Sequence, residues 1–428
     1  MAADERSSGY YNEEREIASV DAWRAYHDQQ IKELAAKSYP EAPALIDLFK
    51  RAGVKPADIT SVEDLKQLPV TTKSDLARLQ AENPPFGGFL TVPVNQLKRI
   101  FMSPGPIYDP QGPANEFWGW SEGFYAAGFR PHDVVINTFG YQMTPAGLMF
   151  EESLLDIGCC IIPTGVGNTE TQVKIMREMG VTGFVGMASF LRKIGETAIT
   201  QGLDPRKDLL LEIGYVAAEI LTDALRSEVE EMFGMRLRQG YGTADCGCLA
   251  YECSERNGMH FTSNAYIEIL DPRTRETMGP GEPGEVVVTL FNPTYPLLRF
   301  GTGDLSAYTV DECACGRTAP RLTRIMGRVD QVTKVKGMFV HPQQAQAVIT
   351  KFPQIKKFQI VVSRVDEIDS MTFKLEMLEA PSAGDPFYDE ISGAIQEGIK
   401  LRPQLEIIAP GTLAENSKLI VDERVWDK

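Results

Sequence analysis

The stretch Asp133-Val134-Val135-Ile136-Asn137 is a short apolar run, and Thr138-Phe139-Gly140-Tyr141 follows it at once. Such a run is typical of a strand buried on both faces. Similar runs recur along the chain at Cys159 to Pro163, Gly183 to Gly186 and Glu212 to Ala217. Helical patterns separate them, at Phe117 to Gly128, Gly147 to Leu155, Thr169 to Met179, Phe190 to Gln201 and Thr222 to Phe233. This alternation predicts a parallel, helix-covered sheet whose ligands bind beyond the carboxyl ends of the strands.

The sequence on either side of this α/β region has a different character. The first hundred residues predict helices, including Ser19 to Lys37 and Pro43 to Ala52, and β patterns dominate after Asn264. We therefore expect an α/β protein with a large N-terminal domain and a small α+β C-terminal domain. We expect the N-terminal domain at 1–327, a hinge at 328–330 and the small domain at 331–428. Within the N-terminal domain we expect a helical start at 1–100, an α/β core at 101–264 and a β-rich segment at 265–327.

Several local signals refine this outline. Ser61 with Asp64, and Thr72 with Asp75, are expected to start helices. Leu90 to Ile100 is expected to be extended, and Met102 to Asp109 to be a loop rich in proline and glycine without regular structure. A short strand is expected at Leu297 to Phe300.

Composition excludes several classes of protein. The 428 residues include 43 Lys and Arg against 59 Asp and Glu, a formal net charge of −16. Such a chain is poorly suited to a nucleic-acid partner, because few cations are available to displace counterions from phosphates. No apolar run approaches the roughly 20 residues that span a bilayer. The polar start at 1–10 lacks the features of a signal peptide, so we expect no membrane partner and a cytoplasmic location.

The stretch Arg238-Gln239-Gly240-Tyr241-Gly242-Thr243-Ala244-Asp245 brings an aromatic ring, a hydroxyl and a carboxylate together between glycines. Glycines beside Tyr241 would let the backbone approach a ligand closely. The ring offers a flat face, and the Asp245 carboxylate can meet a metal or a donor group. The stretch is therefore a candidate site, with a tight turn as the alternative.

Two further stretches carry a family resemblance. Asn137-Thr138-Phe139-Gly140-Tyr141, followed by Gly165-Val166-Gly167-Asn168-Thr169-Glu170, resembles the phenylacetate–coenzyme A ligase branch of the adenylate-forming acyl-CoA synthetases. The likeness extends over nearly the whole chain. It implies a small, mobile C-terminal domain and an ATP-dependent ligase, in which an acid first forms an acyl adenylate and coenzyme A then captures the acyl group. The resemblance also implies a homodimer.

The resemblance assigns roles within the nucleotide site. Tyr241, Gly242 and Thr243 resemble the start of the family's Tyr-Gly-x-x-Glu motif, in which the ring lies against adenine and the acid binds magnesium. Asp245 replaces that glutamate and is one methylene shorter. Ala217-Ala218-Glu219 resembles the adenine-contact segment. Asp304 resembles the acid that accepts the two ribose hydroxyls, since a carboxylate has two acceptor oxygens.

Other resemblances concern the hinge and the small domain. Arg328 resembles an arginine that approaches phosphate or ribose, and Asp330 resembles the hinge pivot. Lys336 and Gly337 would face the site during thioester formation. Lys418 resembles the lysine that neutralises charge on the α-phosphate, with a solvated surface lysine as the alternative.

The acyl pocket is a separate expectation, taken from the loop after the strand at 133–137. Phe139 and Tyr141 are candidate lining residues for an aromatic acid. Core packing explains Phe139 equally well.

The phosphate loop departs from the family pattern. Ser103-Pro104-Gly105-Pro106-Ile107-Tyr108-Asp109 has few hydroxyls, two prolines without N–H groups and an acid that would repel phosphate. The leading hypothesis remains an acid–CoA ligase that acts on an aromatic or aryl-acetic acid with ATP, magnesium and coenzyme A. The alternatives are a nucleotide-binding relative without ligase activity, and adenylylation of another acceptor such as a deazaflavin coenzyme.

Seven cysteines form uneven clusters, and in a reducing compartment they are expected to be thiols or metal ligands. Cys253 and His260, with Cys313 and Cys315, supply three sulfurs and an imidazole, which is a complete tetrahedral zinc set. We leave out the competing pair Cys246 and Cys248, because Cys246 adjoins the candidate magnesium acid. The alternative is three unrelated thiols and a surface histidine.

Overall fold

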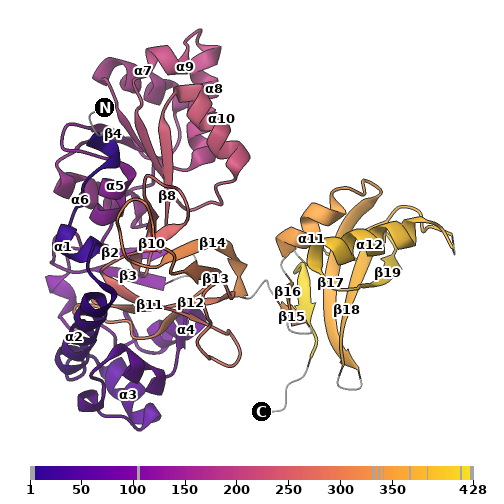
Figure 1. Ribbon diagram of the computed structural model, residues 1–428, viewed down its shortest axis with the longest axis horizontal. Helices are drawn as coiled ribbons and strands as arrows, with labels where there is room; N and C mark the ends of the chain where they lie inside the picture. Colours follow the sequence, from indigo (N-terminus) through magenta and orange to yellow (C-terminus); the bar gives the residue numbers. More distant parts are fainter. Residues whose placement is uncertain are drawn as a thin grey trace. The chain divides into compact units, whose positions relative to one another are not determined.

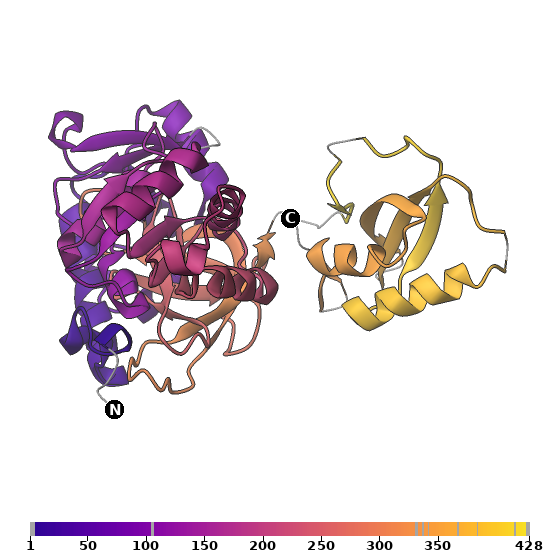
Figure 2. The same cartoon turned by 90° about the horizontal axis from the view of Figure 1, so that it is seen from above.

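A computed structural model gives the structure of residues 5–103, 107–329, 333–335, 338–340, 342–365, 368–382, 384–414 and 417–424. The chain forms two compact units, which Figures 1 and 2 draw from two directions. The large unit comprises Met1–Thr302 and Ala307–Ile325, and the small unit comprises Gly303–Ser306 and Met326–Lys428. None of the helices in the described ranges is long and apolar enough to cross a membrane.

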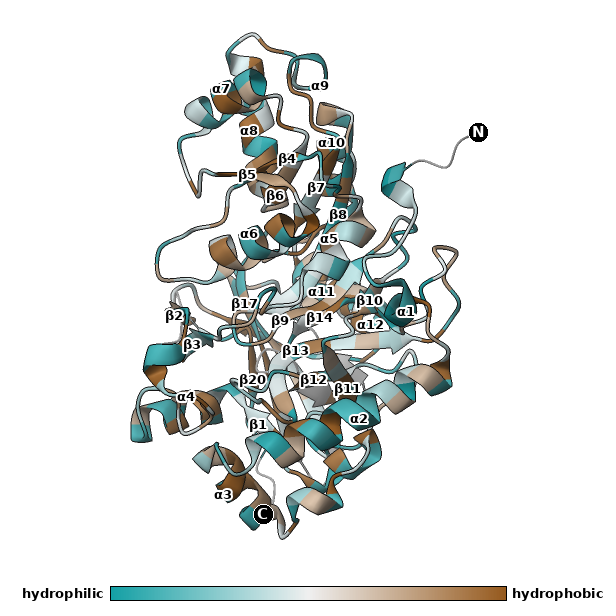
Figure 3. Ribbon diagram, turned by 90° about the vertical axis from the view of Figure 1, so that its left-hand side faces the viewer, coloured by the Kyte–Doolittle hydropathy of each residue, from teal (hydrophilic) through white to brown (hydrophobic). Residues whose placement is uncertain are grey.

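The start of the large unit is mainly helical, as expected. Its helices are η1 (Glu5–Ser7), α1 (Glu13–Glu16), α2 (Val20–Ser38), α3 (Pro43–Ala52), η2 (Pro56–Asp58), η3 (Val62–Gln67), α4 (Lys73–Glu82) and η4 (Val94–Gln96). The capping box of Ser61 and Asp64 is confirmed, although it starts the 3-10 helix η3. Thr72 and Asp75 form the second box, at the start of α4. In Figure 3 helix α2 is mainly teal, which fits a helix that buries only one face.

The α/β core alternates as the sequence predicts. Its elements are α5 (Ser121–Ala127), β4 (Val134–Asn137), α6 (Ala146–Ile157), β5 (Cys160–Pro163), α7 (Thr169–Met179), β6 (Gly183–Gly186), α8 (Ala188–Thr200), α9 (Pro205–Asp208), β7 (Ile213–Val216), α10 (Asp223–Phe233) and β8 (Arg236–Thr243). The strands pair in parallel in the order β5-β4-β6-β7-β8. Figure 1 shows α7 to α10 gathered around this part of the sheet. The carboxyl ends of neighbouring strands therefore meet at one edge.

The β-rich part continues the same sheet. It contains β1 (Thr71–Thr72), β9 (Gly247–Glu252), β10 (Met259–Phe261), β11 (Ala265–Leu270), β12 (Gly284–Leu290), β13 (Phe300–Thr309) and β14 (Arg321–Arg328). The strand order is β11-β12-β13-β14-β10-β9-β8-β7-β6-β4-β5, and β1 pairs with β13. Strand β9 is antiparallel to β8. The turn that joins them lies where the sheet changes from parallel to antiparallel.

Two expectations are wrong. Met102 to Asp109 is expected to be a loop without regular structure, and Leu90 to Ile100 is expected to be extended, but this part of the chain contains η4 and two strands. Strands β2 (Arg99–Ser103) and β3 (Ile107–Gln111) form an antiparallel hairpin that pairs Phe101 with Asp109. The proline-rich residues 104–106 between them lie outside the described residues. Pro110 is tolerated because this hairpin is a two-stranded sheet, in which each strand has a partner on one side only.

Two further boundaries differ from expectation. Strand β13 begins at Phe300 rather than ending there, and it contains Gly301, where a Cβ would lie 2.6 Å from Glu285 Oε1. This glycine marks a close approach inside a strand rather than a turn. Helix α5 begins at Ser121 rather than at Phe117, because Gly119 has a φ of +70° and so cannot continue a right-handed helix.

The small unit has its own core. It contains β15 (Thr333–Val335), β16 (Met338–Val340), α11 (Pro342–Ile349), β17 (Ile355–Val365), β18 (Ile368–Met377), α12 (Phe387–Ile399), β19 (Gln404–Ile408) and β20 (Ile420–Asp422). Four strands form a sheet in the order β19-β18-β17-β20, and the sequence did not indicate β20. Ile360 and Phe373 of the sheet and Ile391 and Ile395 of α12 are fully buried in one cluster. The expected α+β unit is confirmed.

A buried acid in the large unit predicts a pH dependence of stability. Glu122 of α5 is 4% exposed and accepts hydrogen bonds from Ser263 N and Oγ. Burial raises its pKa from 4.5 to about 7. The folded state therefore favours the protonated acid, so this contribution to stability is complete below about pH 4.5 and is lost as the pH rises through 7. Glu122→Gln should abolish that loss.

We expect the free energy of unfolding of Glu122→Gln, relative to the unmodified protein, to rise by about 3 kcal/mol between pH 4.5 and pH 8, at roughly 1.4 kcal/mol per shifted pKa unit. Urea unfolding at several pH values measures this difference. The exposed residue Glu41 provides the control Glu41→Gln, which should leave the pH profile unchanged. Parallel profiles for Glu122→Gln and the unmodified protein would contradict the prediction.

Candidate active site and candidate metal centre

The turn between β8 and β9 holds the residues that the sequence predicts to lie at the centre of the site. Tyr241 pairs with Ala250, the register then shifts, and Thr243 pairs with Gly247. Asp245 therefore lies in the turn itself. Tyr241 is 8% exposed, and its Oη donates to Thr302 Oγ1 at 3.1 Å. The stretch is both a tight turn and a place where an aromatic ring and a carboxylate come together.

The glycines of this turn serve packing within the protein. A Cβ on Gly240 would lie 2.0 Å from Tyr215 Oη, and one on Gly242 would lie 2.1 Å from the carbonyl oxygen of Gly247. The Trp120 ring would lie within 2.7 Å of either Cβ, so neither glycine tolerates a side chain. The sequence predicts that these glycines admit a ligand. The structure adds a packing role, because the protein's own rings and backbone would meet a Cβ at either position.

The segment Ala217-Ala218-Glu219 follows β7, the strand next to β8. Val216, the last residue of β7, pairs with Gln239, so the segment emerges beside the β8 strand. Ala218 has a φ of +70°, an uncommon conformation for a residue with a side chain. Glu219 accepts hydrogen bonds from Ser189 N at 2.7 Å and Ser189 Oγ at 2.8 Å. Its carboxylate thus binds the first turn of α8 and fixes this loop at the strand ends.

Asp245 lies in a buried charge cluster that the sequence pattern did not indicate. Lys73 Nζ donates to Asp245 Oδ2 at 2.9 Å, and the Asp245 side chain is fully buried. Burial lowers the pKa of Lys73, but the negative charge of Asp245 outweighs it and leaves the pKa raised. Asp109 of β3 is the third member. Burial, and then the charge of Asp245, raises its pKa well above the ordinary value.

A sequence signal for Lys73 was available. It is the first residue of α4, directly after the Thr72 cap. A helix N-terminus carries partial positive charge, so a lysine there is unfavourable unless an anion compensates it. The compensating anion is Asp245, 172 residues further along the chain.

Asp304 and Arg328 are brought together within the small unit. Arg328 Nη1 lies 3.0 Å from Asp304 Oδ1, between strands β13 and β14. Lys418 is exposed, and its carbonyl accepts a hydrogen bond from Gln359 Nε2 at 2.9 Å. The candidate residues Asp330, Lys336 and Gly337 lie outside the described residues.

Phe139 and Tyr141 lie in the loop after β4. Phe139 is 8% exposed and packs on Phe150 with ring centroids 4.8 Å apart, so it belongs to the core. Tyr141 Oη donates to Glu151 Oε2 at 2.8 Å and accepts from Asn137 Nδ2 at 2.9 Å. Burial, then the Glu151 contact, raises the pKa of Tyr141. The hydroxyl is held within the protein.

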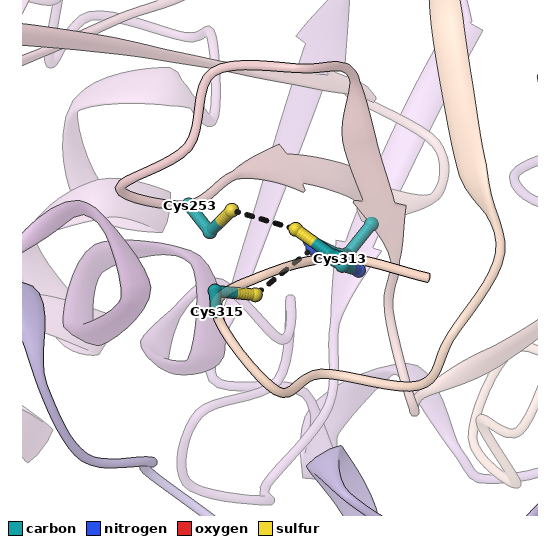
Figure 4. A group of neighbouring side chains, drawn as sticks. Cys253, Cys313 and Cys315 are labelled. Atoms are coloured by element: carbon teal, nitrogen blue, oxygen red, sulfur yellow. Dashed lines mark hydrogen bonds between the residues drawn. The ribbon is translucent and has the colours of Figure 1, made fainter. Parts of the chain in front are cut away.

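The second cluster contains the four expected metal ligands. One ligand atom from each of Cys253, His260, Cys313 and Cys315 lies within 4.8 Å of all the others. Figure 4 shows the sulfurs of Cys253 and Cys313 directed at each other, 3.7 Å apart. Sulfurs bound to one tetrahedral zinc at about 2.3 Å would lie about 3.8 Å apart. His260 is fully buried, which rules out the alternative of a surface histidine.

The hydrogen bonds and pKa values of these four residues also suit a bound cation. The Nδ1 atom of His260 lies 3.1 Å from the carbonyl of Ala319, so Nδ1–H donates there and Nε2 faces Cys315 Sγ at 3.4 Å. A hydrogen bond from Cys253, together with His260, lowers the pKa of Cys315 to about 3. The contact with Cys315, followed by burial, raises the pKa of Cys253. The thiols therefore share protons that a metal ion would displace.

Two protein-family models and several known proteins match this chain. Residues 117–290 match the family model of AMP-binding enzymes, and residues 337–428 match that of the AMP-binding enzyme C-terminal domain. A phenylacetate-coenzyme A ligase of Thermus thermophilus is 32% identical over 89% of this chain and 86% of its own. A phenylacetate-coenzyme A ligase of Pseudomonas putida is 30% identical over 93% of each chain.

A solved structure supports the same fold. The crystal structure of an open conformation of 2-hydroxyisobutyryl-CoA ligase superposes with a TM-score of 0.86, at 22% identity, over 99% of this chain and 95% of that chain. The sequence matches extend over most of both chains, and the fold agrees with them. The chain therefore belongs to the phenylacetate–coenzyme A ligase family of adenylate-forming, AMP-binding enzymes.

Proposed function

We propose that the protein is an ATP-dependent acid–CoA ligase that acts on an aromatic or aryl-acetic acid. The observation that carries the proposal is the meeting of Tyr241, Asp245 and the 217–219 segment at the carboxyl edge of the parallel strands. This is the edge at which open α/β sheets bind ligands. The curated relatives named phenylacetate-coenzyme A ligase support the choice of acid.

In the proposed adenylation step, Ala217, Ala218, Glu219, Tyr241, Gly242 and Thr243 surround the nucleotide base. The acid's carboxylate oxygen attacks the α-phosphorus of ATP, and the bond to pyrophosphate breaks. Magnesium supplies charge neutralisation for the phosphates. Asp245 would hold it, since the buried Oδ1 of that residue accepts no hydrogen bond in the described part of the chain.

The candidate residues of the small unit have proposed roles of their own. Asp304 accepts the ribose hydroxyls, Arg328 approaches the nucleotide, and Lys418 neutralises charge on the α-phosphate. Asp330 acts as the hinge pivot. Lys336 and Gly337 act on the coenzyme A side, where the thiol displaces AMP from the acyl carbon. In the large unit Phe139 and Tyr141 border the acyl group.

Acid-dependent exchange of labelled pyrophosphate into ATP tests the ligase proposal. We expect exchange with phenylacetate well above that with an aliphatic acid of the same length, followed by thioester formation on addition of coenzyme A. Binding of AMP without exchange for any acid would refute the proposal in favour of a nucleotide-binding relative. Adenylate formation that coenzyme A does not discharge would instead favour another acceptor, such as a deazaflavin coenzyme.

The ribose assignment of Asp304 is tested separately by calorimetry with AMP. Asp304→Ala removes two charge-assisted hydrogen bonds of about 1.5 kcal/mol each, so we expect affinity to fall roughly 100-fold or more. Asp311→Ala changes an exposed acid in the segment after the same strand and should bind AMP normally. Unchanged affinity in Asp304→Ala would show that this residue does not hold the ribose.

We also propose that Cys253, His260, Cys313 and Cys315 bind a structural zinc ion. Four protein ligands leave no open coordination position, so the ion would cross-link rather than catalyse. It would tie the loop between β9 and β10 to the segment that precedes β14. The short separations of the ligand atoms support this proposal.

Metal analysis of protein purified without chelator should find about one zinc per chain. The double variant Cys253→Ser, Cys315→Ser should lose the metal and unfold at lower temperature, because two of the four ligands are gone. Cys160→Ser is the matched control, since Cys160 is exposed and outside the cluster. Full zinc retention in the double variant, or less than half an equivalent in the unmodified protein, would contradict the proposal.

A further inference from the structure

Three separate elements of the large unit bring Asp109, Asp245 and Lys73 together. Asp109 lies on β3, Asp245 in the β8–β9 turn and Lys73 at the first position of α4. Gln80 of α4 fixes the hairpin beside the helix, because its amide accepts from Tyr108 N at 2.7 Å and donates to Tyr108 O at 2.9 Å. The side chain next to Tyr108 along β3 therefore turns inward, since neighbouring strand residues face opposite sides.

The cluster has more acceptor capacity than the protein satisfies. Asp109 is 3% exposed and Asp245 is 8% exposed. Among the described residues, neither Oδ atom of Asp109 nor Oδ1 of Asp245 has a hydrogen bond of normal length and angle, although Ser103 and Asp245 lie close to the Asp109 carboxyl. A buried carboxylate without a partner is costly. Lys73 offers a single positive charge to two acids, and it donates its hydrogen bond to Asp245.

We propose that Asp109 and Asp245 jointly bind a divalent cation of the magnesium class, and that Lys73 takes the place of that cation in the free protein. The inference rests on the proposed ligase function, because that function is what would bring a nucleotide to this cluster. Magnesium prefers oxygen ligands and is commonly held by one or two carboxylates together with substrate phosphates. The three unsatisfied carboxylate oxygens provide such ligands.

This assignment gives the altered phosphate loop a physical role. Asp109 by itself would repel the β- and γ-phosphates of ATP. With a bound cation, the same carboxylate would contribute to phosphate binding, because it would hold a positive charge that attracts the phosphates. The second carboxylate also compensates for the short side chain of Asp245, which reaches one methylene less far than glutamate. Hydroxyl-poor sequence at Ser103 to Asp109 is then compatible with ATP use.

Binding of Mn²⁺ to metal-free protein, followed by electron paramagnetic resonance of the free ion, tests the inference without any turnover. We expect Asp109→Asn and Asp245→Asn each to raise the dissociation constant at least tenfold. Lys73→Met should lower it about tenfold, because the competing ammonium is removed. Asp47→Asn, at a residue of α3 outside the cluster, is the control and should match the unmodified protein.

Equal Mn²⁺ affinity in Asp109→Asn and the unmodified protein would overturn the inference. So would weaker binding in Lys73→Met, which would make the lysine a supporting group rather than a competitor. Circular dichroism verifies that each variant is folded, and Lys73→Met retains both carboxylates and tests the competition by itself. Mn²⁺ binding that depends on Asp109, in a protein without pyrophosphate exchange, would refute the ligase proposal and leave this one standing.

Discussion

The close packing of the β8–β9 turn against aromatic residues is the constraint on which the site depends. Gly247 has a φ of +74°, and a Cβ there would lie 2.3 Å from the carbonyl oxygen of Trp118. Together with Gly240 and Gly242, it lets the turn lie directly on the segment before α5. The turn has no freedom to shift, because a neighbouring ring or backbone atom fills the space beside each of these glycines. Tyr241 and Asp245 are therefore held in place before any ligand binds.

The same hairpin connects the two clusters of the large unit. Asp245, with Lys73, lies at one end of β9, and Cys253 follows its other end. Glu252 fixes that second end through a buried pair with Arg226 of α10, 2.7 Å apart. Breaking one partner of such a pair leaves an uncompensated buried charge, so β9 is anchored to α10. The short strand β9 thus separates the carboxylate cluster from the cluster of cysteines and histidine.

The two clusters differ in the type of ligand atom that they offer to a cation. Cys253, Cys313 and Cys315 are thiols or thiolates around one imidazole, which matches a soft, four-coordinate ion. Asp109 and Asp245 offer only oxygen, the ligand atom that a hard divalent cation prefers. Burial contributes in both places, because it strengthens the interaction of charged ligands with a cation.

The sequence by itself determined the parallel strands, the helices between them and the family. Short apolar runs such as 134–137 indicate buried strands through local periodicity, and the Cys253, His260, Cys313 and Cys315 set follows from ligand chemistry. Only the tertiary structure decided the hairpin that carries Asp109, the pairing of Lys73 with Asp245 and the packing role of Gly240 and Gly242. The pairing of Lys73 with Asp245 and the packing of Gly240 against Trp120 join residues far apart in the chain, and Gln80 of α4 holds the hairpin through Tyr108. Strand pairing and burial of this kind override local propensity, so a proline-rich stretch becomes a hairpin and a lysine at a helix start becomes part of the site.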